Sequence, residues 1–266
     1  MYEREKEFVP CILRAAYEQV ILPACSSKGD GIDVFYKGDH DLVTECDFNS
    51  EAFIKAEISK LFPEDCFVSE EKFNISIPDG RAWVLDPVDG TVNFAHGIEI
   101  YGIQIALLVD REPVFSCIFR PLQDEMYIAS LGEGLYLNGR RVYTSRTSKL
   151  SDAVVTFGDY SNSARDTHET QKAIMMALAD SVMRVRMLGS SCTDLAFLGR
   201  GVTDIHIMYC RTPWDIYPGC FAAREAGAVL NFEFKKLDHF VLCAANRELF
   251  DEAIALLDPI NRRTDV

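Results

Sequence analysis

The chain has 266 residues and a formal net charge of −14, with 48% hydrophobic and 26% charged residues. It is long enough to bury a core, and its negative charge argues against nucleic acid as a partner, because a phosphate backbone binds to clustered Lys and Arg. The first seven residues are too charged for a signal peptide, no apolar run approaches a membrane span, and the nine cysteines form no C-x-x-C pair. We therefore expect a cytoplasmic protein with no membrane partner.

Hydrophobic periodicity predicts two amphipathic helices at the start of the chain, over residues 8–21 and 50–62. Residues 26–41, rich in Gly, Asp and Lys, are expected to form a loop between them. Strands are then predicted at 81–85, 102–109, 114–119, 126–129 and 135–137, with a hairpin turn at 110–113.

After residue 145 the pattern changes to strands that alternate with helices. Strands are predicted at 154–157, 182–187, 204–209, 229–234 and 241–244, and helices at 170–179, 193–198, 218–226 and 247–257. Pro218 is placed near a helix start and Gly227 at its C-terminal cap. This change predicts an α+β half over residues 1–145 and an α/β half over 146–266.

The segment 83–94, WVLDPVDGTVNF, carries the chemistry that stands out. A buried strand is expected to stop at Pro87, which leaves Asp86 and Asp89 on a tight turn that Gly90 permits. Two carboxylates held this close suit a Mg²⁺-class ion. Thr91 adds a hydroxyl, and the N–H groups of Gly90 and Thr91 would bind an anion if a helix begins there. Such a string alone is also typical of a surface turn, but a surface turn needs no apolar flanks.

The same segment closely resembles the first signature of the inositol monophosphatase family, W-[VI]-[LV]-D-P-[IL]-D-G-T-x-N-F. A second signature matches residues 214–227, and further blocks match residues 37–47, 70–71 and 189–196, so the resemblance spans 37–227. It implies an α/β fold in the form of a layered αβαβα sandwich. It also implies a Mg²⁺-dependent phosphomonoesterase, inhibited by Li⁺ and acting as a homodimer. The first half would carry most metal ligands and the second would close the active site.

The resemblance assigns roles to residues at the matching positions. It gives Thr91, Asp47 and Glu70 a catalytic role, in which the Thr91 hydroxyl, bonded to Asp47, orients water beside Glu70. Two or three Mg²⁺ ions would be held by five groups: Glu70, Asp86, the carbonyl of Val88, Asp89 and Asp215. The small phosphorylated substrate would contact Asp89, Gly90, Thr91, Gly189, Ser190, Ser191 and Asp215.

Local alternatives stay open for several of these residues. Asp47 would also serve as the N-cap of the helix expected near Ser50. Asp215 would also serve as a cap of the helix that Pro218 helps to start. Glu70 would also fit a solvated loop, and residues 189–196 a helix start packed on a strand. His206 is interpreted as a core histidine whose hydrogen bonds are satisfied.

The substrate is predicted less closely than the reaction. The ending D-G-T-x-N-F resembles the inositol monophosphatase and fructose-bisphosphatase branch, which makes inositol monophosphate the leading candidate. Met208 stands near the position where inositol-specific relatives have a Glu, and a thioether does not accept sugar hydroxyls as a carboxylate does. Fructose 1,6-bisphosphate, 3′-phosphoadenosine 5′-phosphate and histidinol phosphate therefore remain alternatives, as does a non-catalytic protein that only binds metal and a phosphorylated ligand.

Overall fold

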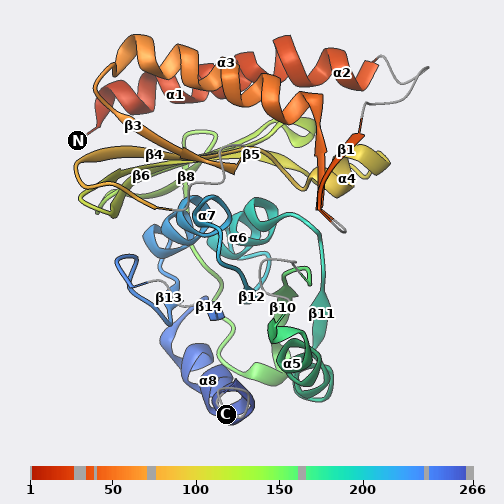
Figure 1. Cartoon of the computed structure of the whole chain (residues 1–266). Coiled ribbons are helices and arrows are strands. Elements are labelled where there is room, and N and C mark those ends of the chain that lie inside the picture. The colour runs from red at the N-terminus through yellow and green to blue at the C-terminus, as the bar shows by residue number, and fades with distance from the viewer. Residues whose placement is uncertain are drawn as a thin grey trace.

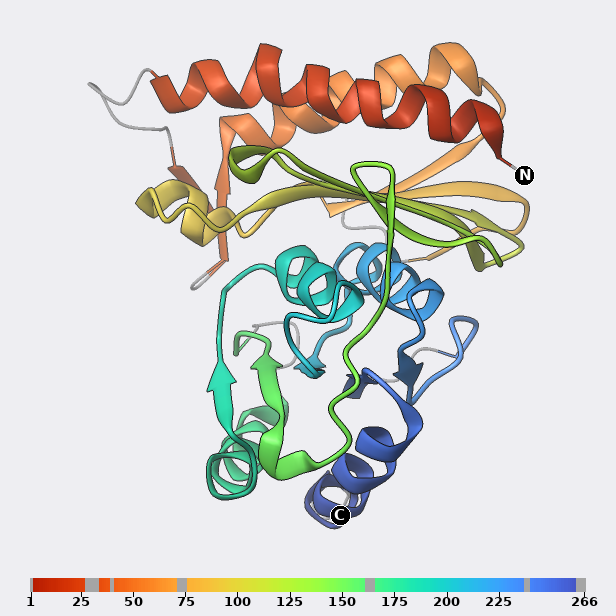
Figure 2. The same ribbon diagram turned by 180° about the vertical axis from the view of Figure 1, so that it is seen from behind.

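The computed structural model describes residues 2–26, 34–38, 41–70, 76–160, 166–236 and 240–261. They form five layers in the order helices, sheet, helices, sheet, helices (Figures 1 and 2). This order confirms the αβαβα sandwich expected from the sequence. Within the described ranges, no helix has the length and apolar character needed to cross a membrane.

The first layer consists of α1 (Glu3–Ala16), a π-helical turn (Tyr17–Ile21), α2 (Leu22–Ser26) and α3 (Glu45–Leu61). Both predicted amphipathic helices are present, and their apolar faces, including Leu13 and Ile54, are buried on the sheet below. Helix α3 begins five residues earlier than expected. The predicted loop 26–41 is wrong over Val34–Gly38, which forms β1 and pairs with β2 (Asp41–Thr44); residues 27–33 and 39–40 lie outside the described residues.

The second layer is a seven-stranded sheet whose strands follow chain order from β3 to β9. All neighbours pair antiparallel except β3 and β4. Glu112 and Pro113 belong to a strand instead of the predicted turn, and β9 was not anticipated. The strands are β3 (Cys66–Ser69), β4 (Arg81–Asp89), β5 (Gly102–Val109), β6 (Glu112–Arg120), β7 (Glu125–Ser130), β8 (Gly134–Leu137) and β9 (Arg140–Val142).

A one-residue bulge in β4 decides where two carboxylates point. Asp86 pairs with Gln104 and Asp89 with Gly102, so three steps along β4 match two steps along β5. Side chains alternate between the two faces of a sheet, and residues three apart would ordinarily face opposite sides. The extra residue resets this alternation and turns both carboxylates to the same face, away from α1 and α3. The strand was expected to stop at Pro87; instead it continues, because Pro87 lies in the unpaired part of the bulge, where no N–H is needed.

The third layer holds α6 (Ser191–Gly199) and α7 (Pro213–Glu225), which pack against the face of the sheet that carries both carboxylates (Figure 1). They approach each other closely at Gly219, where an added Cβ would lie 2.4 Å from Leu195 Cδ1. Pro218 was predicted near the start of α7 but lies inside the helix, which begins at Pro213. Gly227 follows the end of α7 with a positive φ of 112°, as a helix terminus favours.

The fourth layer is a five-stranded mixed sheet with the order β11-β10-β12-β14-β13. Its strands are β10 (Val154–Phe157), β11 (Arg184–Arg186), β12 (Ile205–Tyr209), β13 (Val229–Leu230) and β14 (Phe240–Ala244). All were predicted, although β13 is shorter than the expected 229–234. Helices α5 (His168–Ser181) and α8 (Arg247–Asn261) close the last layer, and α4 (Thr91–His96) follows directly after β4.

Candidate active site

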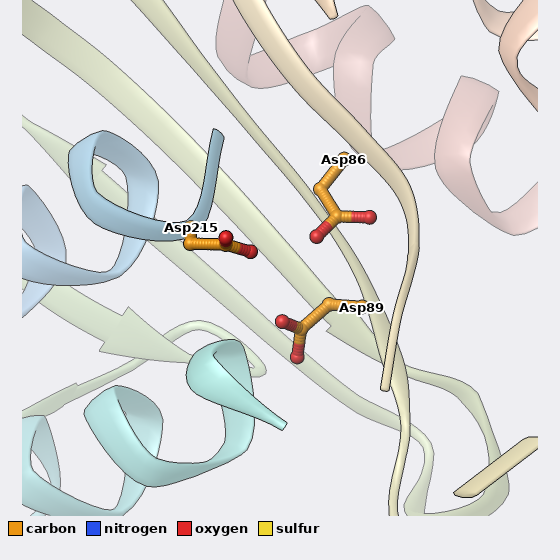
Figure 3. Close-up of side chains that lie close together, drawn as sticks. All are labelled: Asp86, Asp89 and Asp215. Carbon is orange, nitrogen blue, oxygen red and sulfur yellow. The ribbon is translucent and has the colours of Figure 1, made fainter. Parts of the chain in front are cut away.

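Three carboxylates meet where β4 ends beneath the first turn of α7. Each of Asp86, Asp89 and Asp215 offers an oxygen within 4.8 Å of the others, and their side chains point toward one another (Figure 3). Asp86 and Asp89 are 2% and 4% exposed, so both carboxylates are largely shielded from bulk solvent. Residues that are 126 positions apart in the chain thus form one oxygen-rich cluster.

The cluster is electrostatically incomplete without a cation. Burial raises the pKa of Asp86 well above its usual range, and the charges of Glu70, Asp89, Asp215 and Asp47 raise it further. Burial, reinforced by the charge of Asp89, likewise raises the pKa of Asp215 to about 6. Several carboxylates that oppose one another's ionisation are typical of a site for a hard divalent ion, which prefers oxygen ligands. Burial likewise raises the pKa of the neighbouring Cys210 thiol, which donates a hydrogen bond to Asp215 at 3.4 Å.

Asp89 is held in place by the N-terminus of α6. Its two carboxylate oxygens accept hydrogen bonds from the backbone N–H groups of Ser191 (3.1 Å) and Cys192 (3.0 Å). The hydroxyl of Ser191 donates at 2.7 Å, and that of Ser190 is also in hydrogen-bond contact. A carboxylate at a helix N-terminus is favoured by the helix dipole. The N–H group of Ser191 is therefore directed at Asp89 in this structure.

Thr91, Asp47 and the Val88 carbonyl form a second group beside the cluster. The Thr91 hydroxyl lies 3.1 Å from Asp47 Oδ1 and 2.9 Å from the Val88 oxygen, and its single proton can be donated to either. Asp47 lies in the first turn of α3, which begins at Glu45, so the alternative role as N-cap is wrong. The hydroxyl and the carboxylate that the resemblance pairs are thus in contact.

Gly90, between Asp89 and Thr91, is required by the local geometry. Its φ is 91°, and an added Cβ would lie 3.0 Å from the Ile100 oxygen and 3.1 Å from the Gly189 oxygen. The predicted substrate residues Gly90, Gly189, Ser190 and Ser191 line the same cavity as Asp89 and Asp215. The structure therefore brings these residues together.

Glu70 lies just outside the cluster of three. It directly follows β3, which is parallel to β4, and it is the neighbouring charge that acts most strongly on Asp86. Its partner in the predicted pair, Glu71, falls among residues 71–75, outside the described residues.

The sequence analysis assigned no role to three residues that support this site. Gln104 donates to Ser191 Oγ at 2.9 Å and to Asp89 at 3.4 Å. Asn93 donates to the carbonyls of Ile100 (2.8 Å) and Leu188 (2.7 Å), which ties α4 to the segment before α6. Thr212 contacts the carboxylate of Asp215. Thr212 carried a signal, because Thr followed by Pro marks a helix start, and Asn93 is a specified position of the first signature.

Known proteins are similar to this chain over most of its length. The family model described as inositol monophosphatase family matches residues 7–261. A protein of Thermotoga maritima named fructose-1,6-bisphosphatase/inositol-1-monophosphatase is 30% identical over 226 residues, which are 84% of this chain and 85% of the relative.

Solved structures agree with this similarity. The IMPase of Thermotoga maritima superimposes with a TM-score of 0.84 at 26% identity, over 98% of this chain and 99% of that one. A structure described as an IMPase/NADP phosphatase complexed with Mg²⁺ and phosphate has a TM-score of 0.81 at 22% identity, over 96% of this chain and 95% of that one, and shows the shared fold. From the family match and the aligned relative, the chain belongs to the inositol monophosphatase family and is a phosphatase.

Proposed function

We propose that the chain hydrolyses the phosphomonoester of a small polyol or sugar, with Mg²⁺ as cofactor. The observation that carries this proposal is the cluster of Asp86, Asp89 and Asp215, whose oxygens lie within 4.8 Å of one another. A solved structure of the same fold contains Mg²⁺ and phosphate, which supports the choice of ion. Glu70 and the Val88 carbonyl are proposed as further ligands for two or three ions.

When bound, Mg²⁺ would supply positive charge that stabilises the phosphoryl oxygens and makes water a stronger acid. The residues of the chain would do the rest. Asp86, Asp89 and Asp215 fix the position of the charge, and α6 fixes Asp89 through its backbone N–H groups. Thr91, in contact with Asp47, would orient the attacking water and pass its proton toward the buried carboxylate, with Glu70 beside it.

Inositol monophosphate is the first substrate to test, as the resemblance suggests. The relative from Thermotoga maritima is also named for fructose 1,6-bisphosphate, which supports a broader panel. Met208, buried in the cavity wall, offers a thioether where a sugar hydroxyl would need an acceptor. A homodimer is a proposal that the resemblance supports, and a cytoplasmic location is a proposal that the composition supports.

The test is the release of inorganic phosphate from inositol 1-phosphate, fructose 1,6-bisphosphate, 3′-phosphoadenosine 5′-phosphate and histidinol phosphate. We expect release with Mg²⁺, none after chelation by EDTA, and recovery when Mg²⁺ is restored. Asp86→Asn should abolish release, whereas Asp152→Asn, the same change at an exposed aspartate outside the cavity, should not. Binding of these esters without release from any of them would identify a non-catalytic binder instead.

A further inference from the structure

The cavity of about 170 Å³ at the active site has a second acidic wall beyond the proposed metal ligands. Asp159 follows β10, Asp194 lies in α6 and His206 lies in β12, and all three line the cavity together with Asp89 and Asp215. We call Asp159, Asp194 and His206 the acidic wall. None of them matches a residue that the family signatures assign to metal or phosphate.

Two polar atoms of the acidic wall are buried without a partner. Asp194 is 1% exposed and His206 fully buried, and within the described part of the chain neither Asp194 Oδ1 nor His206 Nε2 has a hydrogen-bond partner. The expectation that His206 is a satisfied core residue is therefore wrong for one of its two nitrogens. Buried polar atoms usually have partners, and exceptions that line a cavity point to a ligand.

The arrangement of hydrogen bonds indicates that the unpartnered His206 Nε2 is an acceptor. His206 Nδ1 lies 2.9 Å from Thr156 Oγ1 and 3.9 Å from Asp194 Oδ2, while the Thr156 hydroxyl has the Ile205 carbonyl as its own acceptor at 3.4 Å. A proton on Nδ1 faces two oxygens, so from this network we assign the tautomer that carries its proton on Nδ1. Burial lowers the pKa of His206 to about 3, which keeps the ring neutral and leaves Nε2 with a lone pair only.

The charge of the acidic wall favours a cationic partner. Asp159 and Asp194 add two carboxylates to the cavity, and among the described residues that line it there is no Lys or Arg. Burial and the charges of Asp89 and Asp159 raise the pKa of Asp194, so a cation beside this carboxyl would favour its charged form. A ligand hydroxyl would donate one hydrogen bond but offset no charge. A protonated amine supplies several N–H donors, accepts nothing and brings the missing positive charge.

We propose that the acidic wall binds a protonated amine on the alcohol part of the substrate, so that phosphomonoesters of amino alcohols or amino sugars are the preferred class. This inference rests on the proposed phosphatase function and deepens it. Polar recognition would then lie on Asp159, Asp194 and His206, and not on Met208, which packs tightly against Gly158.

The test compares two esters that differ in one group. Glycerol 1-phosphate and 2-amino-3-hydroxypropyl phosphate have the same skeleton, with a hydroxyl or an ammonium group at the second carbon. With Mg²⁺ at pH 7.5, we expect kcat/KM to be about tenfold higher or more for the amine, mainly through a lower KM. In Asp194→Asn this ratio should fall toward one, and Asp159→Asn should lower it in part. The control Asp152→Asn should keep the wild-type ratio.

The possible outcomes separate the two proposals. Hydrolysis of glycerol 1-phosphate or inositol 1-phosphate without preference for the amine, or a preference that both wall variants retain, would overturn the inference and leave the phosphatase function standing. Failure to release phosphate from any ester would overturn both. If thermal unfolding shows that Asp194→Asn does not fold, Asp159→Asn, at an exposed position, decides.

Discussion

Asp89 and Asp194 are two buried carboxylates of one cavity, and their surroundings differ sharply. Asp89 accepts hydrogen bonds from two backbone N–H groups and from side chains around the start of α6. Asp194, in the same helix region, leaves Oδ1 with no donor among the residues described. How deeply a carboxylate is buried therefore does not by itself show whether it binds an ion or another ligand. Hydrogen bonds from the backbone fix the Asp89 carboxylate in an orientation that suits an ion. Asp194, whose Oδ1 has no such donor in the described ranges, suits a ligand that supplies hydrogen-bond donors of its own.

The largest effect on activity is expected when the charge of Asp89 is removed. Asp89→Asn keeps the shape of the side chain but removes a ligand charge, so kcat/KM for phosphate release should fall about a thousandfold or more, roughly 4 kcal/mol. Circular dichroism should show an unchanged fold, because no core volume is lost. Turnover near the wild-type rate would refute the metal role of Asp89.

The next test concerns the contact between the Thr91 hydroxyl and the buried carboxylate of Asp47. Thr91→Val keeps the size of residue 91 and removes its hydroxyl, and we expect kcat to fall by about a hundredfold. Thr91→Ser should restore most of the activity, because it restores the contact with Asp47. If valine and serine were equally active, the hydroxyl would have no part in the reaction.

A third test weakens the link between the loop after β4 and the segment before α6. Asn93 is 7% exposed and donates to carbonyls on both sides, so Asn93→Ala should lower the free energy of unfolding by about 1–3 kcal/mol. Denaturant unfolding measures this change. Asn49→Ala is the matched control, because within the described ranges the exposed side chain of Asn49 has a single hydrogen bond, to Glu45 in its own helix at 3.4 Å. An equal effect there would contradict the link.

The smallest expected effect is a change with pH in the stability of Asp194→Asn relative to the wild type. The pKa of Asp194 is raised in the folded protein, so its contribution to stability is present at low pH and is lost as pH rises through the folded pKa. Asparagine does not titrate. The unfolding free energy of Asp194→Asn relative to the wild type, measured in EDTA, should therefore increase between pH 4 and pH 8, by about 1 kcal/mol. A difference that stays constant with pH would mean that Asp194 is compensated by a group of the protein.

Much of the fold and of the carboxylate cluster could be predicted from the sequence because local patterns encode them. The strand at 102–109 and the strand at 154–157 were predicted to the residue, since each is a mainly apolar run that a single polar residue interrupts. Asp86, Asp89 and Asp215 lie in signature segments. The bulge at Pro87 was missed, because it depends on pairing with β5 and not on the residues of β4 alone.

The acidic wall could not be predicted for a related reason. His206 and Asp194 each look unremarkable in sequence, as a polar residue within a strand or a helix. Their significance comes from the absence of partners in three dimensions, which no spacing rule expresses. The start of α7 was misplaced at Pro218 because two prolines compete for the role, and Thr212 before Pro213 is the stronger signal.

The bulge in β4 also makes the pairing between β4 and β5 part of the chemistry. If every residue of this segment were paired one to one with β5, regular pleating would turn either Asp86 or Asp89 toward the helices α1 and α3, away from Asp215. Many substitutions at Val88 would preserve the direction of both acids, whereas an added residue in β5 between Gly102 and Gln104 would allow that one-to-one pairing and separate them. The common direction of these acids is therefore encoded in two strands and not in the residue spacing of one.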